Sequence, residues 1–177
     1  MKTNVEAMKA KETSKRAQQV KSVDKAVKNY VQNFDEPVST VEEGAMSYSN
    51  FLNNKMMLVE AIRKGLSYDL FSKIKKITPF TEEDWADYLS LSKKSLQRYQ
   101  KEKNFFFKPI HSEKIIELAE VTNFGRDVFD SKEQFYLWLN TPSYALNNLK
   151  PAELLKDSYG KEMVMAELNR IDHGIFA

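Results

Sequence analysis

Apolar residues recur every three or four positions along most of the chain, and no stretch alternates convincingly between apolar and polar residues. The first spacing is that of a helix that buries one side, whereas a strand that buries one face has a period of two. Glycine and proline, five of each in 177 residues, punctuate the periodic stretches. We therefore predict an all-α fold, a small helical bundle of short elements.

Capping residues mark where several of these helices begin. Thr81 followed by Asp84 resembles a capping box, with Asp in place of the usual Glu. Ser67, Ser92 and Ser131 each precede an apolar stretch, and their hydroxyl groups can accept a bond from the free amides of a first helical turn. Further predicted boundaries are an end near Gly65, a long helix over 109–128, a start at Pro151, and a last helix over about 159–172.

The same spacing predicts which side chains face the core. Met56, Leu58, Val59 and Ile62 lie on the helix that ends near Gly65, and in the next helix the inward residues are expected to be Leu70, Phe71 and Ile74. The long helix is expected to have one apolar side, formed by Ile110, Ile115, Leu118, Ala119, Val121 and Thr122.

The N-terminal region differs from the rest. Residues 1–19 are polar and aperiodic, which is typical of a disordered segment or a frayed helix. An a/d stripe follows, formed by Val20, Val23, Val27, Tyr30 and Phe34. It spans about two heptads, so it can pack on the chain's own body, which we favour slightly, or form a dimer seam. Pro37 ends this helix, and 37–49 reads as a linker.

Composition excludes several kinds of chemistry. The absence of cysteine rules out disulfides, thiolate nucleophiles and cysteine-ligated metals, and His111 and His173 are the only imidazoles. No nucleophile–base pair or phosphate-binding loop is present, so we expect no catalytic residues, no metal, no cofactor and no enzyme activity. No apolar run is long enough for a membrane helix or a signal peptide, which predicts a cytoplasmic protein without membrane contact.

The net charge of +2 conceals a segregation of charge along the chain. Two segments are basic: residues 1–30 contain 8 basic and 3 acidic residues, and residues 61–110 contain 11 basic and 6 acidic residues. Two segments are acidic: residues 31–60 contain 1 basic and 5 acidic residues, and residues 111–177 contain 7 basic and 11 acidic residues. Basic blocks favour phosphate backbones, whereas an acidic half is better suited to a protein partner. Scattered solvated charge is the alternative reading of the same pattern.

Two of the predicted helices have the dimensions of a helix-turn-helix motif. Thr81 to Tyr88, a short turn, and Ser92 to Lys101 follow one another without the glycine that often occupies the turn. Leu96 and Tyr99 would face the core. The side chains predicted to contact DNA are Lys93, Lys94, Ser95, Gln97, Arg98 and Lys101. The alternative is a solvated basic helix in an ordinary bundle.

The last third of the chain holds short motifs in a specific order. Residues 129–142 are similar to "evF…..a..WL.tPn..L", residues 145–155 to "aLgg..P.eLL", and residues 168–177 to "L.rIehGv.a". Upstream, residues 62–66 are similar to "iraGLp" and residues 111–114 to "eSer". Together, over about residues 55–177, these motifs resemble the Xre/MbcA/ParS antitoxin family. Asn147 and Asn148 replace the family's glycine pair, and because asparagine tolerates left-handed backbone the turn is expected to survive.

The resemblance implies an antitoxin of a type II toxin–antitoxin system. Its partner would be a RES-domain toxin, which consumes NAD or ADP-ribosylates proteins, and the antitoxin would cover the toxin's active site. It would also repress its own operon by binding operator DNA, usually as a homodimer. The family's terminal motif implies toxin contact by Arg170, Asp172, His173, Gly174, Ile175, Phe176 and Ala177.

These inferences divide the chain into three parts. Residues 1–48 would form a basic tail, a short amphipathic helix and a linker. Residues 49–108 would form the helix-turn-helix-like DNA-binding region, and residues 109–177 a compact helical toxin-binding domain. Two other functions stay open: a stand-alone helix-turn-helix regulator without a toxin, and an interaction module that recruits a protein through the stripe at 20–34.

Overall fold

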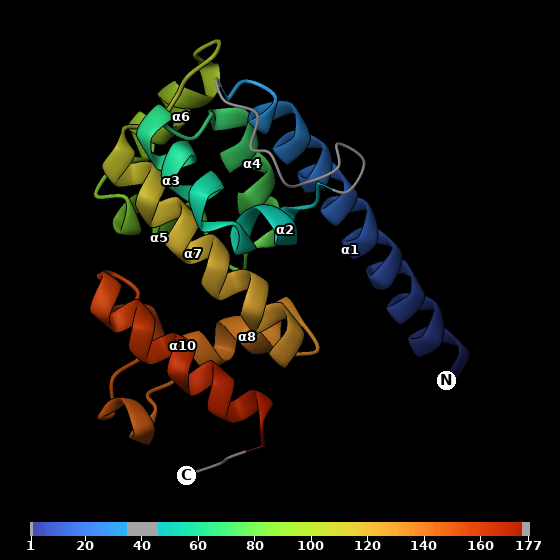
Figure 1. The fold of residues 1–177 in the computed structure, drawn as a ribbon. Coiled ribbons are helices and arrows are strands. Elements are labelled where there is room, and N and C mark those ends of the chain that lie inside the picture. Colours follow the sequence, from blue (N-terminus) through green and yellow to red (C-terminus); the bar gives the residue numbers. More distant parts are fainter. Residues whose placement is uncertain (1, 35–45, 175–177) are drawn as a thin grey trace.

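The computed structural model describes the backbone of residues 2–34 and 46–174. Among the side chains before residue 17, it describes only that of Ser14. The described part is helical and contains no strand, only isolated bridges at Ser67–Phe106 and Ser143–Leu149, which confirms the all-α prediction (Figure 1). In chain order the elements are α1 (Lys2–Val31), α2 (Tyr48–Asn53), α3 (Lys55–Lys64), α4 (Tyr68–Ile77), α5 (Glu82–Tyr88), α6 (Lys93–Lys101), α7 (Pro109–Val128), α8 (Lys132–Leu139), the 3₁₀ turn η1 (Tyr144–Leu146), α9 (Pro151–Leu154) and α10 (Ser158–Asp172).

Local capping explains most of the helix starts. The capping box of Thr81 and Asp84 is present, and the hydroxyl groups of Ser67, Ser92 and Ser131 accept amide bonds in the first turns of α4, α6 and α8. Pro151 occupies the first turn of α9, as predicted. Two further caps, Ser47 and Asn54, divide the region before Gly65 into α2 and α3.

The long helix α1 runs back to Lys2, through residues for which the sequence left disorder or a frayed helix open. Its stripe packs against α4: Val23, Val27 and Tyr30 are buried, and Val20 and Phe34 are half-buried. The Tyr30 hydroxyl donates to the Gly65 carbonyl at 2.8 Å. The stripe therefore packs on the chain's own body, and its role in dimerisation stays a prediction. Most of the expected linker lies outside the described residues.

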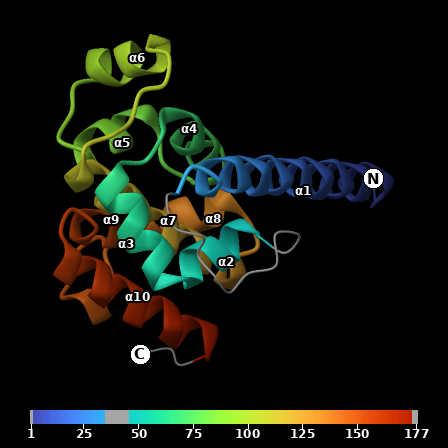
Figure 2. The same ribbon diagram turned by 45° about the horizontal axis from the view of Figure 1, so that its top comes forward.

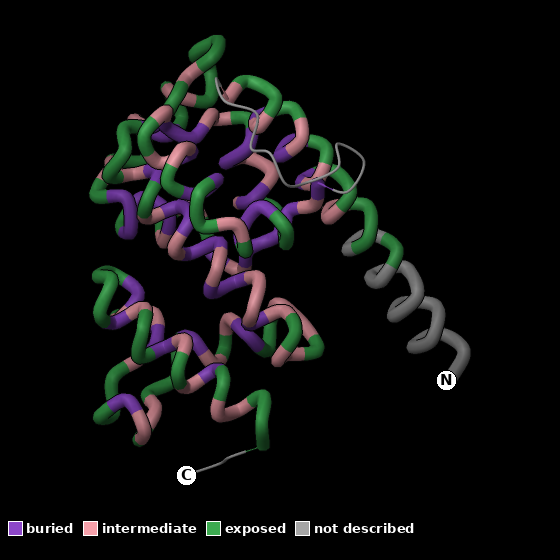
Figure 3. Tube along the Cα trace, viewed as in Figure 1, coloured by how far each residue is buried: buried purple, intermediate pink, exposed green. Residues whose placement is uncertain are grey.

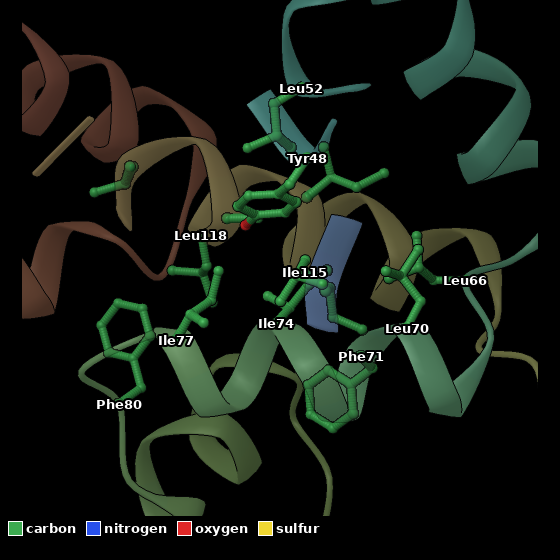
Figure 4. Packing of buried hydrophobic residues seen from close by; sticks show 14 of the residues in the cluster. Tyr48, Leu52, Leu66, Leu70, Phe71, Ile74, Ile77, Phe80, Ile115 and Leu118 are labelled. Atoms are coloured by element: carbon green, nitrogen blue, oxygen red, sulfur yellow. The ribbon is translucent and has the colours of Figure 1, made fainter. Parts of the chain in front are cut away.

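Helix α7 runs through the middle of the molecule, with α3 against one part of its surface and α10 against another (Figures 1 and 2). The prediction of one apolar side was too narrow, because Ile116 is also buried and the buried residues extend around the helix. The close-up in Figure 4 shows Ile115 and Leu118 of α7 packed with side chains of α2 and α4. Figure 3 shows buried residues along α7 and in the helices that surround it.

Leu70, Phe71 and Ile74 are buried as predicted, but Ile110 is not, and two apolar residues of α3 also face outward. Met56 is 71% exposed, and Val59 is also exposed, because α3 turns Met57 and Ala61 inward beside Leu58. Ile110 is 70% exposed, whereas Ser112 in the same turn of α7 is fully buried and bonded to the Leu66 amide, so only one side of this turn is covered. In both cases the residue type favours burial, but the position of a neighbouring helix decides it.

Left-handed backbone is supplied by asparagine in the loop before α9. Asn147 and Asn148 have φ of 57° and 59°, which confirms that the turn survives without the family's glycines.

The backbones of α9 and α10 approach each other closely at Gly160. A Cβ on Gly160 would lie 2.0 Å from the carbonyl oxygen of Leu154. Residue 160 therefore has to be glycine if α10 is to start this close to α9.

We predict that Gly160→Ala lowers the free energy of unfolding by about 1–3 kcal/mol, because the added methyl group meets backbone rather than a movable side chain. The measurement is urea unfolding followed by circular dichroism. Glu162→Ala, an exposed position on the same helix, is the matched control and should change stability by less than about 0.5 kcal/mol. Equal stability of Gly160→Ala and the unaltered chain would contradict the prediction.

Candidate functional site

The turn between α5 and α6 is made without glycine. Ser90 adopts φ of 51°, the left-handed conformation that glycine often provides in such turns. The Leu91 amide donates back to the Ala86 carbonyl at 2.9 Å, and Ser92 then caps α6. The pair therefore forms the compact helix–turn–helix geometry that the sequence predicted.

The inner side of α6 is held by aromatic packing. Leu96 is buried, and the ring of Tyr99 stacks on Phe105 with centroids 3.8 Å apart. Phe105 in turn meets Phe107 edge to face at 5.1 Å. Phe106, between them, is 50% exposed, so the run of three phenylalanines fills the core at two positions only. This packing fixes which side of α6 faces outward.

The outward side presents five of the six predicted DNA-contact residues as exposed side chains, namely Lys93, Lys94, Gln97, Arg98 and Lys101. Ser95 is half-buried, and its hydroxyl lies 3.0 Å from that of Ser92.

Two of these residues have acidic neighbours. Lys93 pairs with Glu83 of α5, and the hydrogen bond from Lys93 lowers the pKa of the Glu83 carboxyl. Arg98 Nε lies 3.7 Å from the Glu102 carboxylate. Both pairs are solvent-exposed, so a phosphate can displace the carboxylate at little cost. Within the described residues, Lys94, Gln97 and Lys101 have no such partner.

The end of α10 is the second candidate site. Val164 and Leu168 anchor the helix in the core. Arg170 Nη1 pairs with Glu167 at 3.1 Å, and His173 Nδ1 donates to the Asn169 carbonyl at 2.7 Å. The Asn169 carbonyl also accepts the backbone N–H of His173 at 3.1 Å, so the imidazole bond is a second contact that holds the ring beside the helix end.

The structure describes only two of the other residues in this predicted toxin-contact set. Asp172 is exposed, and Gly174 has φ of 68° with open space around it. The remaining members, Ile175, Phe176 and Ala177, lie outside the described residues.

Sequence analysis missed a set of exposed apolar side chains near this site. Of the nine large apolar residues exposed in the described part, five lie within residues 125–174, so the enrichment is local. They are Leu137, Tyr144, Leu149, Tyr159 and Met163. A helical-wheel argument could have found two of them: Tyr159 and Met163, four apart, lie next to the buried row of Gly160, Val164 and Leu168.

An ionic cluster ties α3 and α10 to α7. Lys55 and Lys161 approach the two oxygens of Glu120 at 2.6 and 2.5 Å. One turn earlier on α7, Glu117 pairs with Lys114 and accepts a bond from the Ser158 hydroxyl at 2.6 Å. Burial alone would raise the pKa of Glu120, but the hydrogen bonds from Lys161 and Lys55 together outweigh it and lower the pKa.

The described residues contain neither a candidate metal site nor a candidate membrane span. No group of three histidine, aspartate or glutamate side chains is arranged to hold a metal ion there. No helix in that part has the length and apolar content needed to cross a membrane.

Comparison with known proteins assigns both regions. The model of the antitoxin Xre-like helix-turn-helix domain matches residues 57–120, and that of the antitoxin Xre/MbcA/ParS C-terminal toxin-binding domain matches residues 125–174. The curated antitoxin Xre of Yersinia enterocolitica is 26% identical over 122 residues, which cover 68% of this chain and 82% of that protein. The crystal structure of the M. tuberculosis MbcT–MbcA toxin-antitoxin complex has a chain 23% identical, with 60% of this chain and 94% of that chain covered at a TM-score of 0.49.

The molecule thus combines a helix-turn-helix domain with a C-terminal toxin-binding domain. The chain belongs to the Xre/MbcA/ParS antitoxin family, as its motifs predicted. The division at residues 48 and 108 stays a prediction.

We predict that Glu120→Gln destabilises the protein near pH 7 and that its difference from the unaltered chain shrinks as the pH falls below about 4.5. A carboxyl whose pKa is lowered in the folded state stabilises that state above its unfolded pKa, and the contribution is lost as the pH falls through the folded pKa. The measurement is the urea midpoint between pH 7 and pH 3. Glu113→Gln, exposed on the same helix, is the control. A difference that does not change with pH would contradict the prediction.

Proposed function

We propose that this antitoxin neutralises a RES-domain toxin by covering its active site and represses its own operon by binding operator DNA, as a cytoplasmic homodimer. The observation that carries the proposal is the separation of the two candidate surfaces. In both views α6 lies at one end of the molecule and the end of α10 at the other (Figures 1 and 2). A chain arranged in this way can bind DNA and a toxin without one blocking the other.

On the DNA side, the proposed contacts are Lys93, Lys94, Ser95, Gln97, Arg98 and Lys101. Gln97 and Arg98 carry the planar donor groups that suit base edges, and the lysines suit phosphates. Their exposure on one side of an anchored helix supports this assignment.

On the toxin side, the proposed contacts are the residues of the terminal motif, from Arg170 to Ala177. The match of residues 125–174 to a toxin-binding domain supports the site, and so does the exposed end of α10. We include Tyr159 and Met163 in the contact surface, because exposed aromatic and methionine side chains are enriched in protein interfaces.

The homodimer is the part with the least structural support. Val23, Val27 and Tyr30 are already buried against the chain's own helices. Pairing through the stripe would therefore use Val20 and Phe34, its half-buried members.

The proposed function is tested by co-expression with the product of the adjacent gene, scored by growth rescue and co-purification. We expect rescue and a stable complex. Rescue should be lost on deletion of 170–177, because the deletion removes the proposed contact with the toxin. Retained neutralisation by the truncated chain would contradict the site, and neither rescue nor complex with the full chain would favour a stand-alone regulator.

For DNA binding we predict that Lys94→Ala weakens operator affinity and reduces the salt slope of binding by about 0.9, the value for one lost phosphate contact. Fluorescence anisotropy between 50 and 200 mM salt measures both quantities. The same variant should still neutralise the toxin, since α6 lies far from the end of α10. An unchanged slope would remove Lys94 from the DNA contact.

A further inference from the structure

A groove of about 350 Å³ lies between α1 and α4, away from the outward side of α6. Helix α1 contributes Gln18, Gln19 and Ser22 to its lining, and α4 contributes Lys73 and Lys76. All five are polar, and no carboxylate is among them. Beyond the groove, the N-terminal part of α1 runs away from the body in both views (Figures 1 and 2).

This groove is connected to α6 by a second, larger one of about 600 Å³. Lys76 lines both grooves, so they meet at this side chain. The larger groove continues past Lys75 to Gln100 and Asn104, at the carboxyl end of α6. The larger groove also has an aromatic part, formed by Tyr30, Tyr68, Phe105 and Phe106. The two grooves together connect the end of the predicted recognition helix, across the surface of α4, with α1.

Three lysines and two carboxylates line the two grooves together, and the Lys75 ammonium group lies 3.7 Å from the Glu82 carboxylate. The Lys132 ammonium group of α8 donates to the Lys76 carbonyl at 2.5 Å, which adds a cation at the carboxyl end of α4. Both carboxylates line the larger groove, and each has a basic neighbour: Asp69 lies 3.9 Å from Lys73, and Glu102 lies 3.7 Å from Arg98. Lys76 has no ion pair within the described residues.

The sequence extends this charge along α1. Residues 2–19 contain five lysine or arginine residues and two glutamates.

Resting on the proposed DNA-binding function, we infer that the α1–α4 groove is a second contact for the phosphate backbone of the operator, separate from the base-reading side of α6. Lysine ammonium groups donate to phosphate oxygens as point charges, and the glutamine amides of α1 can donate to the same oxygens. The contact adds affinity without sequence preference, and it lengthens the stretch of duplex that each chain covers.

The test compares three variants of the full chain on operator DNA and on an unrelated duplex of equal length. Lys73→Ala/Lys76→Ala should weaken binding to both duplexes by the same factor and reduce each salt slope by about 1.8, which is two phosphate contacts. Lys73→Arg/Lys76→Arg should restore both values, because it keeps the charges. Gln97→Ala on α6 should instead weaken the operator more than the unrelated duplex.

The outcomes separate the two proposals. If the unaltered chain binds neither duplex, the proposed DNA-binding function fails and this inference fails with it. If the unaltered chain binds the operator and Lys73→Ala/Lys76→Ala has the same affinity and slope, the groove does not contact DNA. That second result would overturn the inference about the groove but not the proposed DNA-binding function. An acidic protein segment would then be the ligand to test at the groove.

Discussion

The burial of α7 is the constraint on which the rest of the molecule depends. Its middle turns have no solvent-facing side of any width, since Ile115, Ile116, Leu118 and Ala119 are all buried. Such a helix is stable only when neighbours cover it on several sides, and α2, α3 and α10 do so. The helix-turn-helix domain and the toxin-binding domain therefore share one structural support.

Polar contacts at the two ends of this support set the position of each functional surface. The buried Ser112 hydroxyl accepts from the Leu66 amide at 2.8 Å, which holds the start of α4 against the segment that leads into α7. That segment contains Phe105 and Phe107, which pack with Tyr99 of α6. Further along α7, the Glu120 carboxylate forms ion pairs with Lys55 of α3 and Lys161 of α10. The orientation of α6 relative to α10 thus follows from contacts that α7 organises.

Features that depend on residues within one helical turn were predictable from the sequence, whereas features that depend on distant segments were not. The Thr81–Asp84 box, the Ser92 cap and Pro151 were predicted correctly, because each depends on residues within one helical turn. The helix-turn-helix pair was also predictable, since the turn is short and the apolar spacing strong. Ile110 was assigned to the apolar side of α7 wrongly, because its exposure depends on which side of that turn the neighbouring segments cover. The DNA-facing and toxin-facing residue sets stay predictions, since no contact with either partner is described.

The sequence by itself determined the helices, their caps and the family, all of which are encoded in short-range spacing and in the order of motifs along the chain. It also determined the segregation of charge. Only the tertiary structure decided that the stripe of α1 packs on α4, that Glu120 bridges α3 and α10, and that Lys76 lies where two grooves meet. These features join residues that are tens of positions apart, and the packing of the whole core selects which of the possible pairings forms.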